Sequence, residues 1–207
     1  MTDLLFDGPD DARITVAFAH GAGAPMDSEF MTAIAAKLAD AGLRVARFEF
    51  PYMARRRADG KRRPPDRMPV LLQAFRDAVA ALGPGTVVVA GKSMGGRVAS
   101  MVADEAGAAG LVCFGYPFHP PGKPEKLRTE HLETLRTPAL VLQGERDPFG
   151  SRDEVAGYRL SKSMTVVFLP DGDHDLKPRK ASGRTREENW EEAAAHAVAF
   201  AQGLRRR

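Results

Sequence analysis

Short apolar runs alternate along the chain with stretches in which apolar residues recur every three or four positions. The runs are rich in β-branched residues and are bounded by glycine, proline or charged residues, as in strands buried on both faces. They predict strands at 14–19, 43–50, 86–90, 111–114, 139–142 and 164–169. The helical spacing predicts helices at 30–41, 70–82, 94–106, 153–160 and from 185 onward, and leaves 51–69 irregular.

This alternation predicts an α/β fold, with a mainly parallel central sheet and helices on both faces. We expect a single domain over residues 1–207 without a large cap domain, because the sheet and its helices use nearly the whole chain. The loops at 51–69 and 116–128 are the candidate segments for a small lid. Functional residues should follow the carboxyl ends of the strands, where sites of such sheets lie.

The composition indicates a cellular compartment and argues against a disordered or membrane-spanning protein. Hydrophobic residues make up 43% and charged residues 28% of the 207 residues, which is typical of a globular domain and not of a disordered chain. No apolar run is long enough for a membrane span, and the acidic N-terminus does not resemble a signal peptide. The single cysteine, Cys113, cannot form an internal disulfide, so we expect a cytoplasmic protein without membrane partners.

A candidate nucleophile follows the strand at 86–90. Gly91-Lys92-Ser93-Met94-Gly95 has the G-x-S-x-G spacing of a nucleophile elbow, in which a tight strand-to-helix turn exposes the serine. The helix that begins behind Ser93 offers free N–H groups to a developing oxyanion. The Gly-Lys-Ser sequence also suggests a phosphate-binding loop, but that motif needs glycine where Thr86 stands.

A base and an acid should come later in the chain, in the order serine, acid, histidine. His174 lies in the loop after the last predicted strand and is the expected base, whereas His196 lies inside the last helix. The acid should follow the preceding strand, where Glu145 and Asp147 both stand. We favour Asp147, which ends a Gly-x-x-Asp turn and precedes a proline, and keep Glu145 as the alternative.

The glycine-rich loop His20-Gly21-Ala22-Gly23 follows the first of these strands and predicts half of an oxyanion hole. We expect the N–H groups of Ala22 and Met94 to be the two donors, and His20 to brace the loop. Asp171, Asp173 and Asp175 have the spacing of a metal loop but lack its glycine and glutamate, so we expect neither metal nor other cofactor.

Together these residues resemble the α/β-hydrolase superfamily over nearly the whole chain. Gly91–Arg97, Phe50-Pro51-Tyr52-Met53 and 115–123 are similar to a small subgroup that includes testis-expressed protein 30 and the hydrolase-like domain of the nonspecific-lethal complex subunit 3. The subgroup is close to the dienelactone-hydrolase-like branch, whose namesakes use cysteine where this chain has Ser93. The resemblance implies a serine hydrolase without a metal or organic cofactor. Together with the residues above, we expect it to cleave a small ester or thioester through Ser93, His174 and Asp147. The candidate substrate contacts are Gly21, Tyr52, Arg55 and Tyr116.

The net charge of the chain is +3, and its positive charge is concentrated in three segments. Residues 51–67 and 176–186 each carry +5, and residues 205–207 carry +3, so the rest of the chain is acidic. The first two segments follow strands, which favours a basic rim around the site and an anionic acyl substrate, with plain solvated loops as the alternative. Nucleic acid is a weaker interpretation because few aromatic residues accompany the charges. A third interpretation is a non-catalytic interaction module on the same fold.

Overall fold

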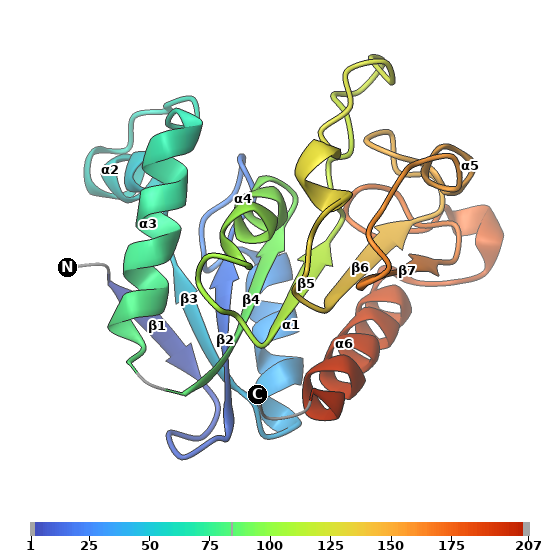
Figure 1. Ribbon diagram of the computed structural model, residues 1–207. Helices are drawn as coiled ribbons and strands as arrows, with labels where there is room; N and C mark the ends of the chain where they lie inside the picture. Colours follow the sequence, from blue (N-terminus) through green and yellow to red (C-terminus); the bar gives the residue numbers. More distant parts are fainter. Residues whose placement is uncertain (1–2, 84, 205–207) are drawn as a thin grey trace.

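The molecule is built around a twisted seven-stranded sheet (Figure 1). The structure is a computed structural model that describes residues 3–83 and 85–204. The strand order is β1-β3-β2-β4-β5-β6-β7, and all neighbours are parallel except β1, which pairs antiparallel with β3. The strands are β1 (Leu4–Asp7), β2 (Ile14–Ala19), β3 (Arg44–Phe48), β4 (Thr86–Lys92), β5 (Gly110–Phe114), β6 (Ala139–Gly144) and β7 (Met164–Leu169). The predicted fold class is therefore confirmed.

Helices cover both faces of the sheet. The longer ones are α1 (Glu29–Asp40), α2 (Pro51–Asp59), α3 (Met68–Ala81), α4 (Met94–Val102) and α6 (Arg186–Gly203); α5 (Arg152–Val155) and the 3₁₀ turns η1 (Glu130–Leu132) and η2 (Lys180–Ser182) are short. One apolar cluster joins α2, α3 and α4 to one face, and a second joins α1 and α6 to the other. The central strands are buried on both sides, which explains their continuous apolar runs.

Four local predictions differ from the structure. First, the helix expected at 94–106 ends at Val102, as α4. Residues 51–59, expected to be irregular, form α2, which begins with Pro51 in its first turn and ends at Gly60 in the left-handed conformation. The helix expected at 153–160 is only the single turn of α5, which starts with a capping box on Ser151. The edge strand β1 was not predicted, since only its pairing with β3 defines its four residues.

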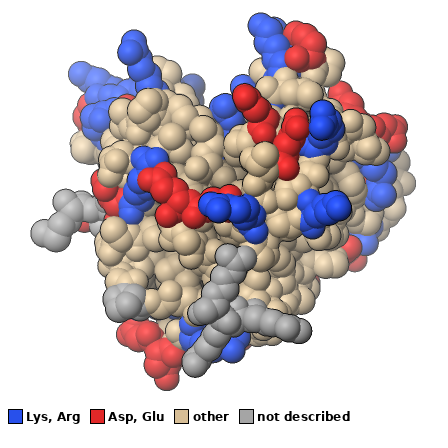
Figure 2. Space-filling view, viewed as in Figure 1, with Lys and Arg blue, Asp and Glu red and all other residues tan. Residues whose placement is uncertain are grey.

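The carboxyl ends of the strands meet at one edge of the sheet, as the parallel order requires. Figure 2 shows that the surface at this edge is hollowed between two raised sides, one over α2 and α3 and the other over the segment before η1. In the part of the chain that the structure describes, no helix has both the length and the apolar character needed to cross a membrane.

Candidate active site

Ser93 lies at the sharp turn between β4 and α4. Its backbone has φ 52° and ψ −116°, a region that non-glycine residues rarely adopt, so the turn is strained. The neighbouring glycines leave the space for it: a Cβ on Gly91 would lie 2.2 Å from the Gly95 carbonyl carbon, and one on Gly95 would lie 2.5 Å from the Ala19 carbonyl oxygen. The turn is anchored to the next strand, because the N–H of Ser93 donates to the carbonyl of Phe114 at 3.0 Å.

Three side chains form a continuous hydrogen-bonded series at this turn. The Nε2 atom of His174 lies 2.7 Å from the Oγ of Ser93, and its Nδ1 lies 2.8 Å from Oδ2 of Asp147. His174 follows β7, Asp147 follows β6 and Ser93 follows β4, so the parallel sheet brings residues 81 and 27 positions apart together. Asp147 is fully buried, whereas the His174 side chain keeps 19% of its surface exposed.

The carboxylate of Asp147 is held in place by neutral donors. The side-chain amide of Gln143 donates to Oδ2 at 2.9 Å, and the N–H of Phe149 donates to Oδ1 at 2.8 Å. Gln143 is itself fully buried at the end of β6, and its Oε1 accepts from the N–H of Tyr116 at 2.7 Å. These contacts fix the orientation of the carboxylate that faces His174.

The histidine is also held from its other sides. Lys92, 7% exposed, donates from Nζ to the carbonyl oxygen of His174 at 2.6 Å and forms an ion pair with Asp175 at 3.2 Å. The ring of Phe149 packs against the imidazole, with the two centroids 4.1 Å apart. Burial lowers the pKa of Lys92, while the carboxylates of Asp175 and Asp147 oppose that shift. This lysine is thus a support of the histidine loop rather than a free phosphate ligand.

The loop after β2 approaches the serine from the opposite side. His20 is completely buried, its Nδ1 donates to the Gly21 carbonyl at 2.6 Å, and its Nε2 accepts from the N–H of Phe50 at 3.1 Å. Desolvation lowers the pKa of His20, in keeping with a neutral ring in this role. The hydroxyl of Tyr52 donates to the carbonyl of Ala22 at 2.9 Å. The loop is therefore braced by β3 and α2.

A cavity of about 320 Å³ opens beside Ser93. It lies between the α2–α3 connection and the segment after β5, so both segments that were expected to form a small lid, 51–69 and 116–128, contribute to its walls. Its lining residues are Ala22, Pro65, Asp66, Met68, Leu71, Ser93, Met94, Arg97, Pro117, Arg128 and Phe149. Ala22 and Met94, the two expected oxyanion donors, are thus neighbours of Ser93 in the same cavity.

The four candidate substrate contacts lie around this cavity rather than among its lining residues. Tyr52 and Tyr116 are buried, and Tyr116 donates from its hydroxyl to the Arg128 carbonyl at 3.2 Å. Gly21 is buried, with room for a Cβ 3.6 Å from the Cβ of Ser93. Arg55 forms an ion pair with Asp66 at 2.6 Å. Substrate binding by these residues stays a prediction.

The rejected alternatives occupy other environments. Glu145 forms an ion pair with Arg152 at 2.8 Å and accepts from the N–H of Asp171, and His196 is exposed on α6. A second serine–histidine pair exists, since the Oγ of Ser100 lies 2.8 Å from Nε2 of His131. Ser100 lies inside α4 with 3% exposure and bonds the carbonyl of Arg97, so it lacks the exposed turn of a nucleophile.

Sequence reasoning missed the supporting residues Lys92, Gln143 and Phe149, and also the two arginines of the cavity, Arg97 and Arg128. Lys92 occupies a variable position of the elbow motif, and Phe149 follows the turn that carries Asp147. Their proximity to the expected triad was visible in the sequence. The contacts of these side chains could not be predicted from the sequence, because they depend on how β5, β6 and the loop that carries His174 pack together.

Comparisons with known proteins agree with this architecture. Residues 12–202 match the family described as an alpha/beta hydrolase domain. A dienelactone hydrolase from Anabaena variabilis superposes with a TM-score of 0.73 at 22% identity, covering 97% of this chain and 91% of that one. A serine hydrolase without a lid from Xanthomonas campestris gives 0.67 at 22% identity, covering 100% and 91%. The esterase domain of a Rhodothermus marinus protein gives 0.70 at 18% identity, covering 96% and 91%.

Proposed function

Because the chain belongs to the alpha/beta hydrolase family, we propose that it is a serine hydrolase acting on a small carboxylic ester or thioester. The observation that carries the proposal is the hydrogen-bonded series from Asp147 through His174 to Ser93, at the strained turn after β4. In this arrangement the imidazole contacts both an alcohol and a buried carboxylate, which is the geometry of an activated nucleophile.

The chemical steps follow from these contacts. His174 takes the hydroxyl proton of Ser93 at Nε2 while Oγ attacks the acyl carbon, and the carbonyl π bond opens to an oxyanion. Collapse of this intermediate breaks the bond to the leaving group, which receives the proton from His174. Water then attacks the acyl-enzyme with His174 again as the base, releasing the acid and restoring Ser93. Asp147 holds the Nδ1–H tautomer throughout.

The oxyanion needs donors that are in place before the reaction. Met94 is the first residue of α4, so its N–H has no acceptor within the helix. Ala22 lines the same cavity from the other side, on a loop that His20 and Tyr52 brace. We therefore assign the N–H groups of Met94 and Ala22 to the oxyanion hole.

Two finer assignments belong to the same proposal. Gly91–Arg97 and the proline-rich segment 115–123 support membership of the subgroup that includes testis-expressed protein 30 and the nonspecific-lethal complex subunit 3 domain. The lone Cys113 is free and buried, which supports a reducing compartment such as the cytoplasm.

A fluorophosphonate probe tests the mechanism directly, because it labels only an activated serine. We expect the wild type to be labelled and to hydrolyse short-chain aryl esters. Ser93→Ala should abolish labelling and lower kcat by about 10⁴-fold or more. Ser100→Ala is the matched control, since it removes the serine of the second serine–histidine pair and should remain labelled.

The opposite results would identify a different function. An unlabelled, folded wild type without esterase activity would favour the non-catalytic interaction module. Equal labelling of Ser93→Ala would assign the reactive serine elsewhere, and loss of labelling in Ser100→Ala alone would point to the pair with His131.

A further inference from the structure

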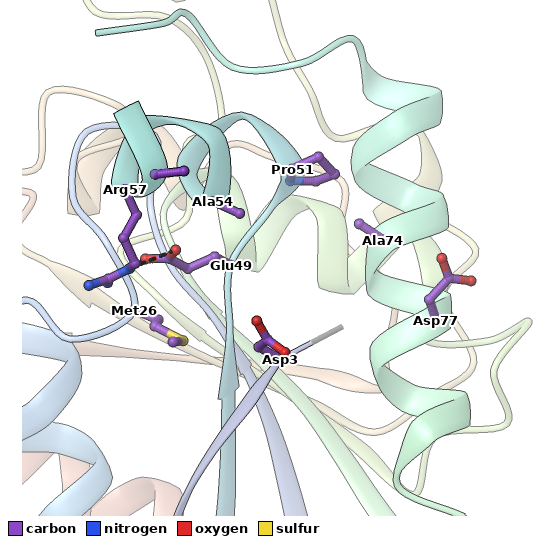
Figure 3. A pocket seen from close by; sticks show the side chains of 9 residues that line it. Asp3, Met26, Glu49, Pro51, Ala54, Arg57, Ala74 and Asp77 are labelled. Carbon is purple, nitrogen blue, oxygen red and sulfur yellow. Dashed lines mark hydrogen bonds and ion pairs between the residues drawn. The ribbon is translucent and has the colours of Figure 1, made fainter. Parts of the chain in front are cut away.

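Three of the seven basic residues in the segment 51–67 are paired with carboxylates, among them Arg55 with Asp66. Arg57 forms ion pairs with Asp27 at 2.8 Å and Glu49 at 2.6 Å, and Arg63 pairs with Asp59. Figure 3 shows the Arg57 side chain meeting Glu49 beside a separate pocket of about 460 Å³ that α2 and α3 border. That pocket does not include Ser93 among its described lining residues. None of the seven basic residues of this segment is among the described residues that line the Ser93 cavity, so an anion bound beside Ser93 contacts other cations.

Two arginines of the Ser93 cavity have no such carboxylate partners. Within residues 3–83 and 85–204, the guanidinium groups of Arg97 and Arg128 make neither an ion pair nor a hydrogen bond with a side chain. Both also line the adjoining pocket over α4 and η1. The one acidic side chain among the described residues lining the Ser93 cavity, Asp66, is occupied by Arg55 and the N–H of Tyr52. The cavity wall thus carries two uncompensated positive charges.

These charges are partly withdrawn from water. Arg97 and Arg128 are half-buried, and the Nε of Arg97 is a buried donor without a partner in the described part of the chain. Burial and the neighbouring charge of Arg97 lower the pKa of Arg128, and the same two causes lower the pKa of His131 to about 4. Two neighbouring guanidinium groups that are partly buried without a counter-charge destabilise the fold, and a bound anion would offset this unfavourable free energy.

We propose that Arg97 and Arg128 bind an anionic group, such as a carboxylate, on the substrate whose ester bond Ser93 attacks. This inference rests on the proposed function and names the substrate class of that same site. The guanidinium group presents several N–H donors in a planar fork, which matches the two oxygens of a carboxylate.

The position of Arg97 sets the scale of that substrate. Arg97 lies one helical turn after Ser93, and its N–H donates to the Ser93 carbonyl at 3.0 Å. Arg97 and Ser93 also line the same cavity of about 320 Å³, so the charged end of the substrate and its scissile carbonyl both have to fit within that cavity. A dicarboxylic acid esterified at one end, with about four methylene groups between its carbonyls, is small enough for such a cavity and serves as the probe.

Matched pairs of esters test the inference. On the acyl side, the para-nitrophenyl ester of adipate with a free carboxylate is compared with the same ester carrying a methyl ester instead. On the leaving-group side, para-acetoxybenzoate is compared with its methyl ester. We expect the wild type to prefer the charged member of at least one pair by about tenfold or more in kcat/KM, and the pair that responds identifies the side of the ester.

The variants Arg97→Met and Arg128→Met keep an apolar stem and remove the charge. We expect each to lower the ratio of kcat/KM for the charged ester to kcat/KM for the neutral ester by about tenfold or more. Arg159→Met is the matched control, because Arg159 is 88% exposed and 3.8 Å from Glu133, outside the cavity lining. Turnover of the neutral ester shows that each variant is folded.

Binding of adipate to Ser93→Ala, measured by calorimetry, separates this inference from the proposed function. Adipate binding that Arg97→Met weakens at least about tenfold supports the anion site even if no ester is hydrolysed. Hydrolysis of neutral and charged esters in the same ratio by the wild type and both arginine variants, with adipate binding unaffected, would overturn it while leaving the hydrolase intact.

Discussion

Lys92 illustrates how one buried side chain can govern a reaction that it does not touch. Its Nζ bonds the backbone carbonyl of His174 and the carboxylate of Asp175, and it lies 5.6 Å above the ring of Phe30. The lysine therefore positions the loop that carries the base. It does not line the cavity beside Ser93, so substrate binding should be independent of it.

Lys92→Met should lower kcat about tenfold or more with little change in KM, because the imidazole loses its fixed position against Ser93. It should also lower the free energy of unfolding by about 1–3 kcal/mol, since the His174 carbonyl loses its buried donor. Steady-state kinetics and urea unfolding measure the two effects. Lys92→Arg restores a cation and should recover part of kcat. An unchanged kcat in folded Lys92→Met would show that the loop carrying His174 keeps its position without the lysine.

At the scale of the elements, the site depends on how closely α4 approaches the sheet. A Cβ on Gly95 would lie 2.5 Å from the carbonyl oxygen of Ala19 and 2.6 Å from that of His20, both of which are backbone atoms. The end of β2 and the first turn of α4 are therefore in direct contact. This contact sets the spacing between Ser93 and the loop that carries Ala22.

Gly95→Ala should push α4 away from β2, lowering the free energy of unfolding by about 1–3 kcal/mol and slowing ester hydrolysis. Gly203→Ala is the control, because no atom of the described residues lies within 4 Å of a Cβ at that helical position and alanine favours helices. Thermal unfolding and kcat/KM compare the two variants. Equal stability and activity in both would mean that the backbone at the elbow adjusts without cost.

The elements also show which parts of the fold a sequence can reveal. Apolar periodicity predicted the strands at 14–19 and 164–169 with their observed bounds, because buried parallel strands are continuous apolar runs. The chain order of serine, acid and histidine then predicted which residues would meet at the sheet edge. Apolar periodicity did not predict α2, because this helix is rich in arginine and buries only Tyr52 and Met53. It could not predict Gln143 or Arg128 in the site, since both arrive there through packing between distant segments.

For the whole molecule, two histidines make stability dependent on mildly acidic pH. Burial lowers the pKa of His20, and burial together with the charge of Arg97 lowers that of His131 from 6.5 to about 4. Below pH 6.5 the unfolded chain takes up protons that the folded chain refuses, so stability is fully present above that pH and is lost as pH falls toward 4. Carboxylates such as Asp171, whose pKa the Arg179 guanidinium lowers to about 2, add a loss only at still lower pH.

His131→Gln should therefore flatten the fall in stability between pH 7 and pH 4.5. Glutamine keeps a polar group near Ser100 but cannot be protonated, so the variant should lose roughly 2 kcal/mol less than the wild type over this range, after allowance for partial exposure of the ring. Urea unfolding at several pH values gives the two slopes, and His196→Gln, on the exposed face of α6, is the control. Parallel curves for wild type and His131→Gln would assign the acid sensitivity to other groups. A flattened curve would assign this part of the acid sensitivity to His131, whose pKa is lowered first by burial and then by the charge of Arg97.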